Sequence, residues 1–384
     1  MKSFPIMTYV FAGMLSITPL VAKAATTGAN SFNPAISVIL NGTYAQFDND
    51  PANYAIPGFA LGEEVGPGEE GFSIGESELV ISANVDDLFY GRFTAAVTTE
   101  DSIEVEEAYL ETIGLGAGMT IKFGRFLSGL GYLNKKHAHT WDFTDQPLVY
   151  KAMLADQLKD DGLQVRWLAP TDLFFEIGVE AFRGESFPAG GAADNGKGTH
   201  AVFAHIGGDI NDSHSWLAGL SYLQAEANAR ETGDPAENFT GNSKLAVFDF
   251  VWKWAPGGNY RETNFILQGE YFLRSEDGSY QSIPYDADQN GYYLQAVYQF
   301  MPRWRAGLRY DNLQADDPGA AFVGTALDTQ GHDPERWTAM IDFSRTEFSR
   351  LRLQYSIDDS LPETNNQFYV QYIMSLGAHA AHSF

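Results

Sequence analysis

The chain has 384 residues, no cysteine and a formal net charge of −26, from 24 basic and 50 acidic residues. This balance excludes nucleic acid as a partner, because binding to phosphates needs a basic surface. The lack of cysteine excludes disulfides, thiolate nucleophiles and cysteine metal sites. Charged residues make up only 19% and aromatic residues 14%, which favours one domain with acidic loops that concentrate cations near them.

The first 24 residues predict a cleavable secretory signal. Lys2 supplies a positive charge, an apolar stretch follows over residues 4–21, and Ala22 and Ala24 are the small residues of a signal-peptidase site. We therefore expect a signal peptide at 1–24 and a mature domain at 25–384. Beyond Ala24 no apolar run is long enough to cross a bilayer as a helix. A mature chain in a membrane must then be a closed barrel, since only helices and closed barrels satisfy every backbone polar group in lipid.

Apolar and polar residues alternate with a period of two from residue 35 to the C-terminus, which predicts β-strands. For example, Leu351 and Leu353 alternate with Arg350 and Arg352. The segments run near the about 9–11 residues of a tilted membrane strand. Roughly sixteen segments fit this pattern. They begin near Ile36, Ser73, Phe89, Val105, Met119, Leu163, Phe174, Thr199, Trp216, Leu245, Asn264, Gly291, Trp304, Arg336, Arg350 and Gln367.

Short and long connections alternate along the chain. The short links are 86–88, 169–172, 211–214, 301–303 and 345–348. The long links are 48–71, 127–161, 184–198, 227–243, 275–289 and 314–335. The link at 100–102 breaks this order, because it is short and falls on the rim of the long loops. Short turns on one rim and long loops on the other are typical of bacterial outer-membrane barrels. We therefore predict an all-β fold, a transmembrane antiparallel β-barrel of about sixteen strands with short periplasmic turns and long extracellular loops.

The end of the chain favours the same compartment. The strand near Gln367 alternates apolar and polar residues, and the last residue is Phe384. A closing strand with a terminal aromatic residue resembles the C-terminal assembly signal of outer-membrane barrels. The predicted location is the outer membrane of a Gram-negative bacterium, with lipid, lipopolysaccharide and the barrel assembly machinery as partners. The sequence leaves open whether the barrel forms a homotrimer.

Four stretches resemble a known group of proteins. They are GRFLSGLGYLNKKHAHTWDFTDQP from Gly124, DDGLQVRWLAPTDLFFEIG from Asp160, DINDSHSWLAGLSYL from Asp209, and YIMSLGAHAAHSF at the end. The chain resembles proteobacterial outer-membrane proteins with porin-like barrels, which are often labelled porins or zinc-regulated receptors of the TonB-dependent type. Such receptors have about 22 strands around a folded plug. Here the alternation begins about ten residues after the expected cleavage, which leaves no room for a plug domain. The resemblance therefore implies a porin.

Charged residues on the polar phase of the strands are expected to face the lumen, because a charge facing lipid costs about 2–4 kcal/mol near the midplane. They either pair across strands for stability or set up a field that selects ions. The predicted channel-lining residues are Arg92, Lys122, Arg305, Arg309, Arg350, Arg352, Glu76, Glu78, Glu107 and Glu111.

The connection 127–161 is the expected constriction loop, since loops of more than about a dozen residues are usually functional or disordered. Its candidate residues are Lys135, Lys136, His137, His139, Asp142 and Asp145. In an extended segment His137 and His139 point to the same side, and with Asp142 or Asp145 they form a candidate zinc site. Solvated or hydrogen-bonded histidines are the simpler interpretation, because zinc needs three or four well-placed ligands.

The sequence predicts a porin-like channel for passive diffusion of small solutes or ions. The alternative is an outer-membrane receptor or uptake protein for zinc or a metal complex. No sequence motif of a nucleophile elbow, phosphate-binding loop or metalloprotease is present, so we expect no enzyme activity and no cofactor other than zinc at His137 and His139.

Overall fold

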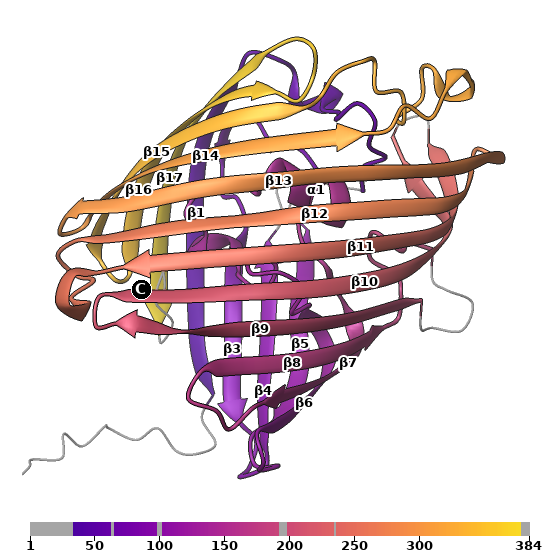
Figure 1. The fold of residues 1–384 in the computed structure, drawn as a ribbon. Coiled ribbons are helices and arrows are strands. Elements are labelled where there is room, and N and C mark those ends of the chain that lie inside the picture. The colour runs from indigo at the N-terminus through magenta and orange to yellow at the C-terminus, as the bar shows by residue number, and fades with distance from the viewer. Residues whose placement is uncertain (1–33, 63–64, 98–101, 192–197, 234–235, 378–384) are drawn as a thin grey trace, which may run out of the picture. The chain divides into compact units, whose positions relative to one another are not determined.

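The computed structural model describes residues 34–62, 65–97, 102–191, 198–233 and 236–377 (Figure 1). The predicted signal at 1–24, most of the short link at 100–102, and Phe384 lie outside these residues. Among the described residues no helix is long and apolar enough to cross a membrane.

The described residues form one antiparallel sheet that closes on itself. The last strand, β17, pairs with the first, β1, from Ser37 opposite Gly377 to Phe47 opposite Gln367. The strands are β1 Ala35–Phe47, β2 Gly71–Ser73, β3 Ser77–Asn84, β4 Phe89–Val97, β5 Ile103–Thr112, β6 Met119–Leu127, β7 Lys159–Leu168, β8 Phe174–Phe182, β9 Thr199–Asn211, β10 His214–Thr232, β11 Glu237–Trp254, β12 Asn264–Tyr280, β13 Ile283–Met301, β14 Trp304–Ala315, β15 Glu335–Thr346, β16 Ser349–Asp359 and β17 Asn365–Gly377.

The barrel wall counts as sixteen-stranded. The short strand β2 and the strand β3 lie end to end along β1 and together occupy one strand position. Between them Gly75 has a φ of +53°, and a Cβ there would come within 2.8 Å of Asn41 Nδ2, so glycine suits both the backbone and the space. The all-β barrel and its strand number are confirmed. Each predicted segment falls on one strand position of the barrel, since the alternation is imposed by lipid on one side and the lumen on the other.

The outer face of the wall is apolar, as the predicted phase requires. On β16 Leu351 and Leu353 are exposed, whereas Arg350 and Arg352 are buried toward the lumen. Apart from the short β2, each strand of the described residues pairs on both sides, although β5 pairs with β6 only from Ala108 to Glu111. The closed wall and its apolar outer face confirm the predicted location in the bacterial outer membrane.

Two of the expected long loops are wrong, because the strands continue through them. β12 and β13 extend into the expected loop 275–289 and meet at a tight turn in which Gln281 and Ser282 have φ of 50° and 66°. β10 and β11 likewise extend into 227–243. These extensions carry charged residues such as Asp277 on their outer face. Above the membrane the outer face meets water, so the apolar half of the alternation disappears while backbone pairing continues.

We expect Leu308→Arg, on the exposed outer face of β14, to lower the free energy of unfolding by about 2–4 kcal/mol, because the new charge faces lipid near mid-strand. The matched control is Ile283→Arg at the tip of the β12–β13 extension, where the cost is expected to stay within about 1 kcal/mol. Reversible denaturant unfolding in lipid vesicles measures both. Equal costs would show that Leu308 does not face lipid.

Candidate functional site

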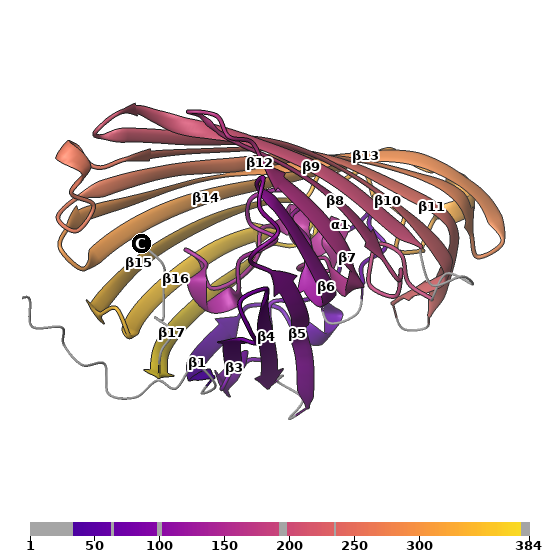
Figure 2. The same cartoon turned by 90° about the horizontal axis from the view of Figure 1, so that it is seen from below.

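The segment between β6 and β7, residues 128–158, lies inside the barrel, and we call it the lumen loop. It contains a short 3-10 helix, Ala138–Thr140, and the helix α1, Leu148–Leu154, whose residues are all buried. Figure 1 shows α1 behind the long strands of the front wall, and Figure 2 shows it enclosed by them.

An apolar sector of the wall receives α1. Tyr150 packs edge-on against Phe272 of β12, with ring centroids 5.1 Å apart, and also contacts Tyr293 of β13. Leu223 and Leu245 belong to the same buried cluster. Inward-facing residues of the long strands are therefore apolar where the helix docks, in place of the polar lining of an open lumen.

The first half of the lumen loop docks through its backbone N–H groups. Ser128 Oγ and Gly129 N donate to the buried carboxylate of Glu180, the latter at 2.9 Å. Tyr132 N and Leu133 N donate to Glu270, which also accepts from the hydroxyls of two buried tyrosines. The wall thus supplies acceptors for a stretch of loop that has no secondary-structure partners of its own.

Gly131 makes this close approach feasible. Its φ is +64°, and a Cβ at this position would lie 2.3 Å from Glu270 Oε2. Only glycine adopts this conformation without steric cost and leaves room for the carboxylate.

The second half of the lumen loop docks through arginines. We call Arg305, Arg309, Arg336, Arg350 and Arg352, from β14, β15 and β16, the arginine row. Arg350 and Arg352 each donate at 2.6 Å to a loop carbonyl, those of His139 and Trp141. Arg305 pairs with Asp142 at 2.8 Å and with Asp342 of the neighbouring strand at 2.6 Å. Strand arginines thus supply donors where the loop offers carbonyls and carboxylates.

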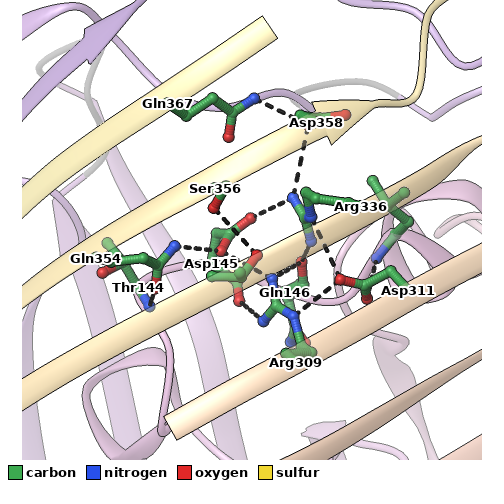
Figure 3. A network of polar contacts seen from close by, with 12 residues as sticks. Thr144, Asp145, Gln146, Arg309, Asp311, Arg336, Gln354, Ser356, Asp358 and Gln367 are labelled. Carbon is green, nitrogen blue, oxygen red and sulfur yellow. Dashed lines mark hydrogen bonds and ion pairs between the residues drawn. The ribbon is translucent and has the colours of Figure 1, made fainter. Parts of the chain in front are cut away.

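Asp145 lies at the centre of these contacts (Figure 3). Its carboxylate accepts from Arg336 at 2.6 Å, from Arg309 at 3.0 Å and from Gln354 at 3.0 Å. Burial raises the pKa of Asp145, but the charges of Arg336, Arg309 and Lys151 outweigh it and hold the pKa well below its ordinary value. Asp145 is therefore a charged anchor of the lumen loop at neutral pH.

A second polar cluster lies where the lumen loop meets β3 and β5. His137 Nε2 is 2.9 Å from Glu107 Oε2, and His139 Nδ1 is 2.8 Å from Glu78 Oε1. Arg92 of β4 pairs with Glu107 at 2.9 Å. The two imidazole rings stack with centroids 5.8 Å apart, so both histidines face the same wall. We call these five residues, together with Glu106, the histidine cluster.

Glu106 enters this cluster through a bulge in β5. The register of β4 and β5 pairs Thr94 with Glu107 and Ala95 with Val105, so Glu106 has no partner in the ladder. The extra residue shifts the phase of the strand, so two consecutive glutamates, 106 and 107, are both buried on the side of His137. Bulges of this kind often re-aim side chains at functional sites.

The carboxylates also change the protonation of His137. Burial lowers the pKa of its imidazole, but the nearby carboxylates of Glu106 and Glu107 and the charge of Glu78 outweigh burial and raise the pKa to about 10. The cluster therefore has a strong affinity for positive charge.

Two cavities lie on either side of the lumen loop. The outer cavity, of about 820 Å³, is bounded by the long extracellular segments and by Ala138, Trp141 and Lys151 of the loop. The inner cavity, of about 1120 Å³, opens among the short turns and is bounded by Tyr132 and Lys136 of the loop. No residue lines both cavities. Among the described residues, the lumen loop therefore stands between them.

The two cavities carry opposite charge. The acidic residues of the outer cavity are Glu69, Glu76, Glu104, Glu106, Asp145, Asp156, Glu185 and Glu231, against the basic Lys151, Lys159 and Arg230. The basic residues of the inner cavity are Lys136, Lys253, Arg261, Arg303, Arg305 and Arg345, against the acidic Asp142, Asp209, Asp212 and Glu347. The outer cavity attracts cations, and the inner one has a moderate excess of positive charge.

The predicted site residues divide among these features. Glu76 lines the outer cavity and Arg305 the inner one, whereas Arg309, Arg350 and Arg352 are buried under the lumen loop. Arg92, Glu78 and Glu107 belong to the histidine cluster. Lys122 and Glu111 pair with one another at 3.7 Å on the wall.

The predicted loop residues are likewise separated. Lys136 lines the inner cavity, with its ammonium 3.8 Å from the ring centroid of Tyr132, and the exposed Lys135 precedes it. His137 and His139 share the histidine cluster, but Asp142 and Asp145 lie on the arginine row. The two aspartates are thus held by arginines and not by the histidines that the sequence grouped with them.

Sequence reasoning missed three of the residues that matter here. Arg336 marks only the start of a predicted strand in the sequence. Glu106 directly precedes Glu107, and this interruption of the alternation in β5 was the signal that could have indicated the bulge. Glu270 lies on the polar phase of its strand, but nothing in the sequence indicates that it binds the loop.

Comparisons with known proteins find similarity both by sequence and by fold. No family model matches the chain. A protein of Aquifex aeolicus described as uncharacterized is 31% identical over 403 residues, covering 97% of this chain and 83% of that protein.

Among solved structures, the anion-selective porin of Comamonas acidovorans has a TM-score of 0.58 at 11% identity, with 90% of this chain and 99% of that chain covered. A loop-deletion mutant of OmpT of Vibrio cholerae has a TM-score of 0.57 at 14% identity, with 90% and 99% covered. The outer-membrane channel DcaP of Acinetobacter baumannii has a TM-score of 0.55 at 12% identity, with 89% and 97% covered. The fold is therefore that of a porin-like outer-membrane barrel.

Proposed function

The chain belongs to the same family as the Aquifex aeolicus protein, and from that premise and the porin-like fold we propose that it is an outer-membrane channel for passive diffusion of small solutes and ions. The observation that carries this proposal is the lumen loop, which divides the lumen into two polar cavities. A wall of sixteen strands encloses more space than its side chains fill. We propose that the lumen loop sets the size of the passage between the cavities.

The acidic outer cavity supports a preference for cations at the extracellular mouth. A cavity lined mainly by carboxylates between low-dielectric walls raises the local concentration of cations. The similar solved structures include proteins described as a porin and as a channel, and we propose no enzyme activity. The alternative of a plugged receptor is unsupported, since such receptors have about 22 strands and this wall has sixteen.

The test is conductance of the purified protein in planar bilayers, followed by reversal potentials in a salt gradient. We expect the triple variant Glu69→Gln, Glu104→Gln, Glu185→Gln to lower cation selectivity, because all three line the outer cavity. Lys253→Gln in the inner cavity is expected to shift selectivity toward cations. Low salt is best, because at 1 M the Debye length shrinks to about 3 Å. A wild-type protein without conductance would contradict the proposal.

We further propose that the barrel assembles as a homotrimer. One of the solved structures of similar fold is described as the trimer form of Vibrio cholerae OmpT. Native mass spectrometry of the detergent-solubilised protein tests this, and a strictly monomeric species at all concentrations would contradict it.

A further inference from the structure

We propose that Glu78, Glu106 and His137 form a binding site for one divalent transition-metal ion, which joins the lumen loop to strands β3 and β5. The site goes beyond the channel function and does not depend on it, because binding can be measured whether or not the barrel conducts.

Two of the three distances between the ligand atoms match the spacing that zinc requires. His137 Nδ1 is 3.4 Å from Glu106 Oε2 and 3.6 Å from Glu78 Oε2, and all three atoms lie within 4.8 Å of one another. Zinc bonds of about 2.0–2.2 Å in a tetrahedron separate neighbouring ligand atoms by about 3.3–3.6 Å. The two distances to the imidazole therefore fit a shared cation with little movement.

Two of these atoms are buried without a hydrogen-bond partner. The side chains of Glu78 and Glu106 are 0% and 8% exposed, and the Oε2 atom of each lacks a hydrogen bond. Both face the same ring nitrogen, His137 Nδ1, which carries at most one proton and so cannot donate to both. Buried carboxylate oxygens without a hydrogen bond are costly. Their contacts to His137 Nδ1 are long, at 3.6 and 3.4 Å, and a single metal ion between the three atoms would satisfy both oxygens.

The surrounding residues have the arrangement of an outer coordination shell. A metal-bound histidine commonly donates its other ring N–H to a carboxylate, which fixes the tautomer and the ring orientation. His137 Nε2 lies 2.9 Å from Glu107 Oε2, and Arg92 holds that carboxylate from the other side at 2.9 Å. Arg92 Nη2 is also 3.2 Å from the same ring nitrogen. Glu78 is fixed through its second oxygen by His139.

The charge of the cluster matches a divalent ion. A metal ion bound at His137 Nδ1 displaces any proton on that nitrogen. Glu78, Glu106 and Glu107 then contribute three negative charges and Arg92 one positive charge, so the bound ion meets a doubly negative set of side chains. Glu106 and the neighbouring Ala138 line the acidic outer cavity. That cavity gives cations and water a route to the site, and a water molecule from it can take a fourth coordination position. An imidazole with carboxylates suits zinc among the common divalent metals.

The bulge in β5 provides an independent reason to expect a ligand. Without the bulge Glu106 would face lipid, where a carboxylate is costly. The ladder gives up one pairing to place Glu106 beside Glu107, and this arrangement adds negative charge to an already acidic cluster. A bulge that brings two glutamates together is hard to explain by stability alone, but it completes a set of metal ligands.

The experiment is isothermal titration calorimetry with ZnCl₂ on the full mature barrel, refolded in detergent free of lipopolysaccharide, carrying no histidine tag and treated with chelator beforehand. We expect one Zn²⁺ per chain. Glu106→Gln and His137→Gln are each expected to weaken binding at least about tenfold, since loss of a supporting group alone typically costs 10-fold or more. Co²⁺ provides a second readout, because a tetrahedral site with a nitrogen ligand gives strong visible absorption that the variants should lose.

Glu69→Gln is the matched control, because it neutralises one carboxylate of the same outer cavity outside the cluster. It is expected to bind Zn²⁺ as the wild type does. All variants must show the heat-modifiable migration of a folded barrel, and if His137→Gln fails to fold, Glu106→Gln alone decides. No saturable binding by the wild type overturns the proposal. Equal affinities of Glu106→Gln and wild type, or equal weakening by Glu69→Gln, overturn it as well.

Discussion

Removal of residues 132–155 from the lumen loop, bridged by a short Gly-Ser linker, is expected to raise single-channel conductance several-fold. The deleted residues separate the two cavities, and a sixteen-strand barrel without them leaves an aqueous channel. The wall should still fold, because its backbone hydrogen bonds run between strands and close through β1 and β17. Charged groups that the loop now covers, such as Glu270 and Arg336, would become hydrated by the water that replaces it.

Single-channel recording in planar bilayers measures the effect. The control is the shortening of a turn that lines neither cavity, such as deletion of Leu115 in the exposed turn between β5 and β6, which is expected to leave conductance unchanged. A loop-deleted barrel that folds, as judged by heat-modifiable migration, but conducts no better than the wild type would show that the lumen loop does not limit passage.

Asp145→Asn is expected to loosen the docking of the lumen loop by about 3–5 kcal/mol, the usual cost of removing one partner of a buried ion pair. Asp145 accepts from both Arg309 and Arg336, and both arginines are buried. Asparagine keeps the shape but leaves two guanidinium groups short of a negative charge. The measurement is hydrogen–deuterium exchange of residues 138–154, which should become faster while exchange in the wall strands stays unchanged.

The exposed Asp87, in the turn between β3 and β4, provides the control variant Asp87→Asn, which is expected to leave exchange in the lumen loop unaltered. Equal protection of the loop in wild type and Asp145→Asn would show that the ion pairs do not hold it.

The same residue predicts the pH dependence of docking. The pKa of Asp145 lies well below its ordinary value of 3.8, because its attraction to Arg336 and Arg309 outweighs burial. A lowered pKa stabilises the docked state above the ordinary value and loses that contribution as the pH falls through the lowered pKa. We expect the wild-type loop to remain protected from neutral pH down to pH 4 and to lose this contribution only below. In Asp145→Asn the contribution of this ion pair to loop docking is expected to be missing already at neutral pH.

The strands of the barrel could be predicted because each carries its own alternation of apolar and polar residues. Leu351 and Leu353 alternate with Arg350 and Arg352 because lipid and lumen impose opposite demands on successive residues. That local rule does not depend on which strand lies next door, so it can be read from one sequence. The rule fails where the outer face of the barrel lies beyond the lipid. The extensions of β12 and β13 are an example, because the sequence predicts a loop there at 275–289.

The contacts between the lumen loop and the wall could not be predicted from the sequence. Its length marked it as a constriction loop, and Asp142 and Asp145 were correctly singled out as charged residues of that loop. Their partners are Arg305 on β14 and Arg336 on β15, more than 160 residues away along the chain. Which strand charge meets which loop charge depends on where the folded loop lies within the closed wall, and no local pattern contains that information.

By itself the sequence determined the barrel, its sixteen strands and the phase of their side chains, since these follow from local alternation. The tertiary structure alone decided the partners of His137. The sequence paired it with aspartates five and eight residues ahead, but those are held by arginines. A one-residue bulge instead turns Glu106 toward the imidazole. A bulge reverses the face of a side chain without changing the composition of its strand, so only the register of the folded sheet establishes it.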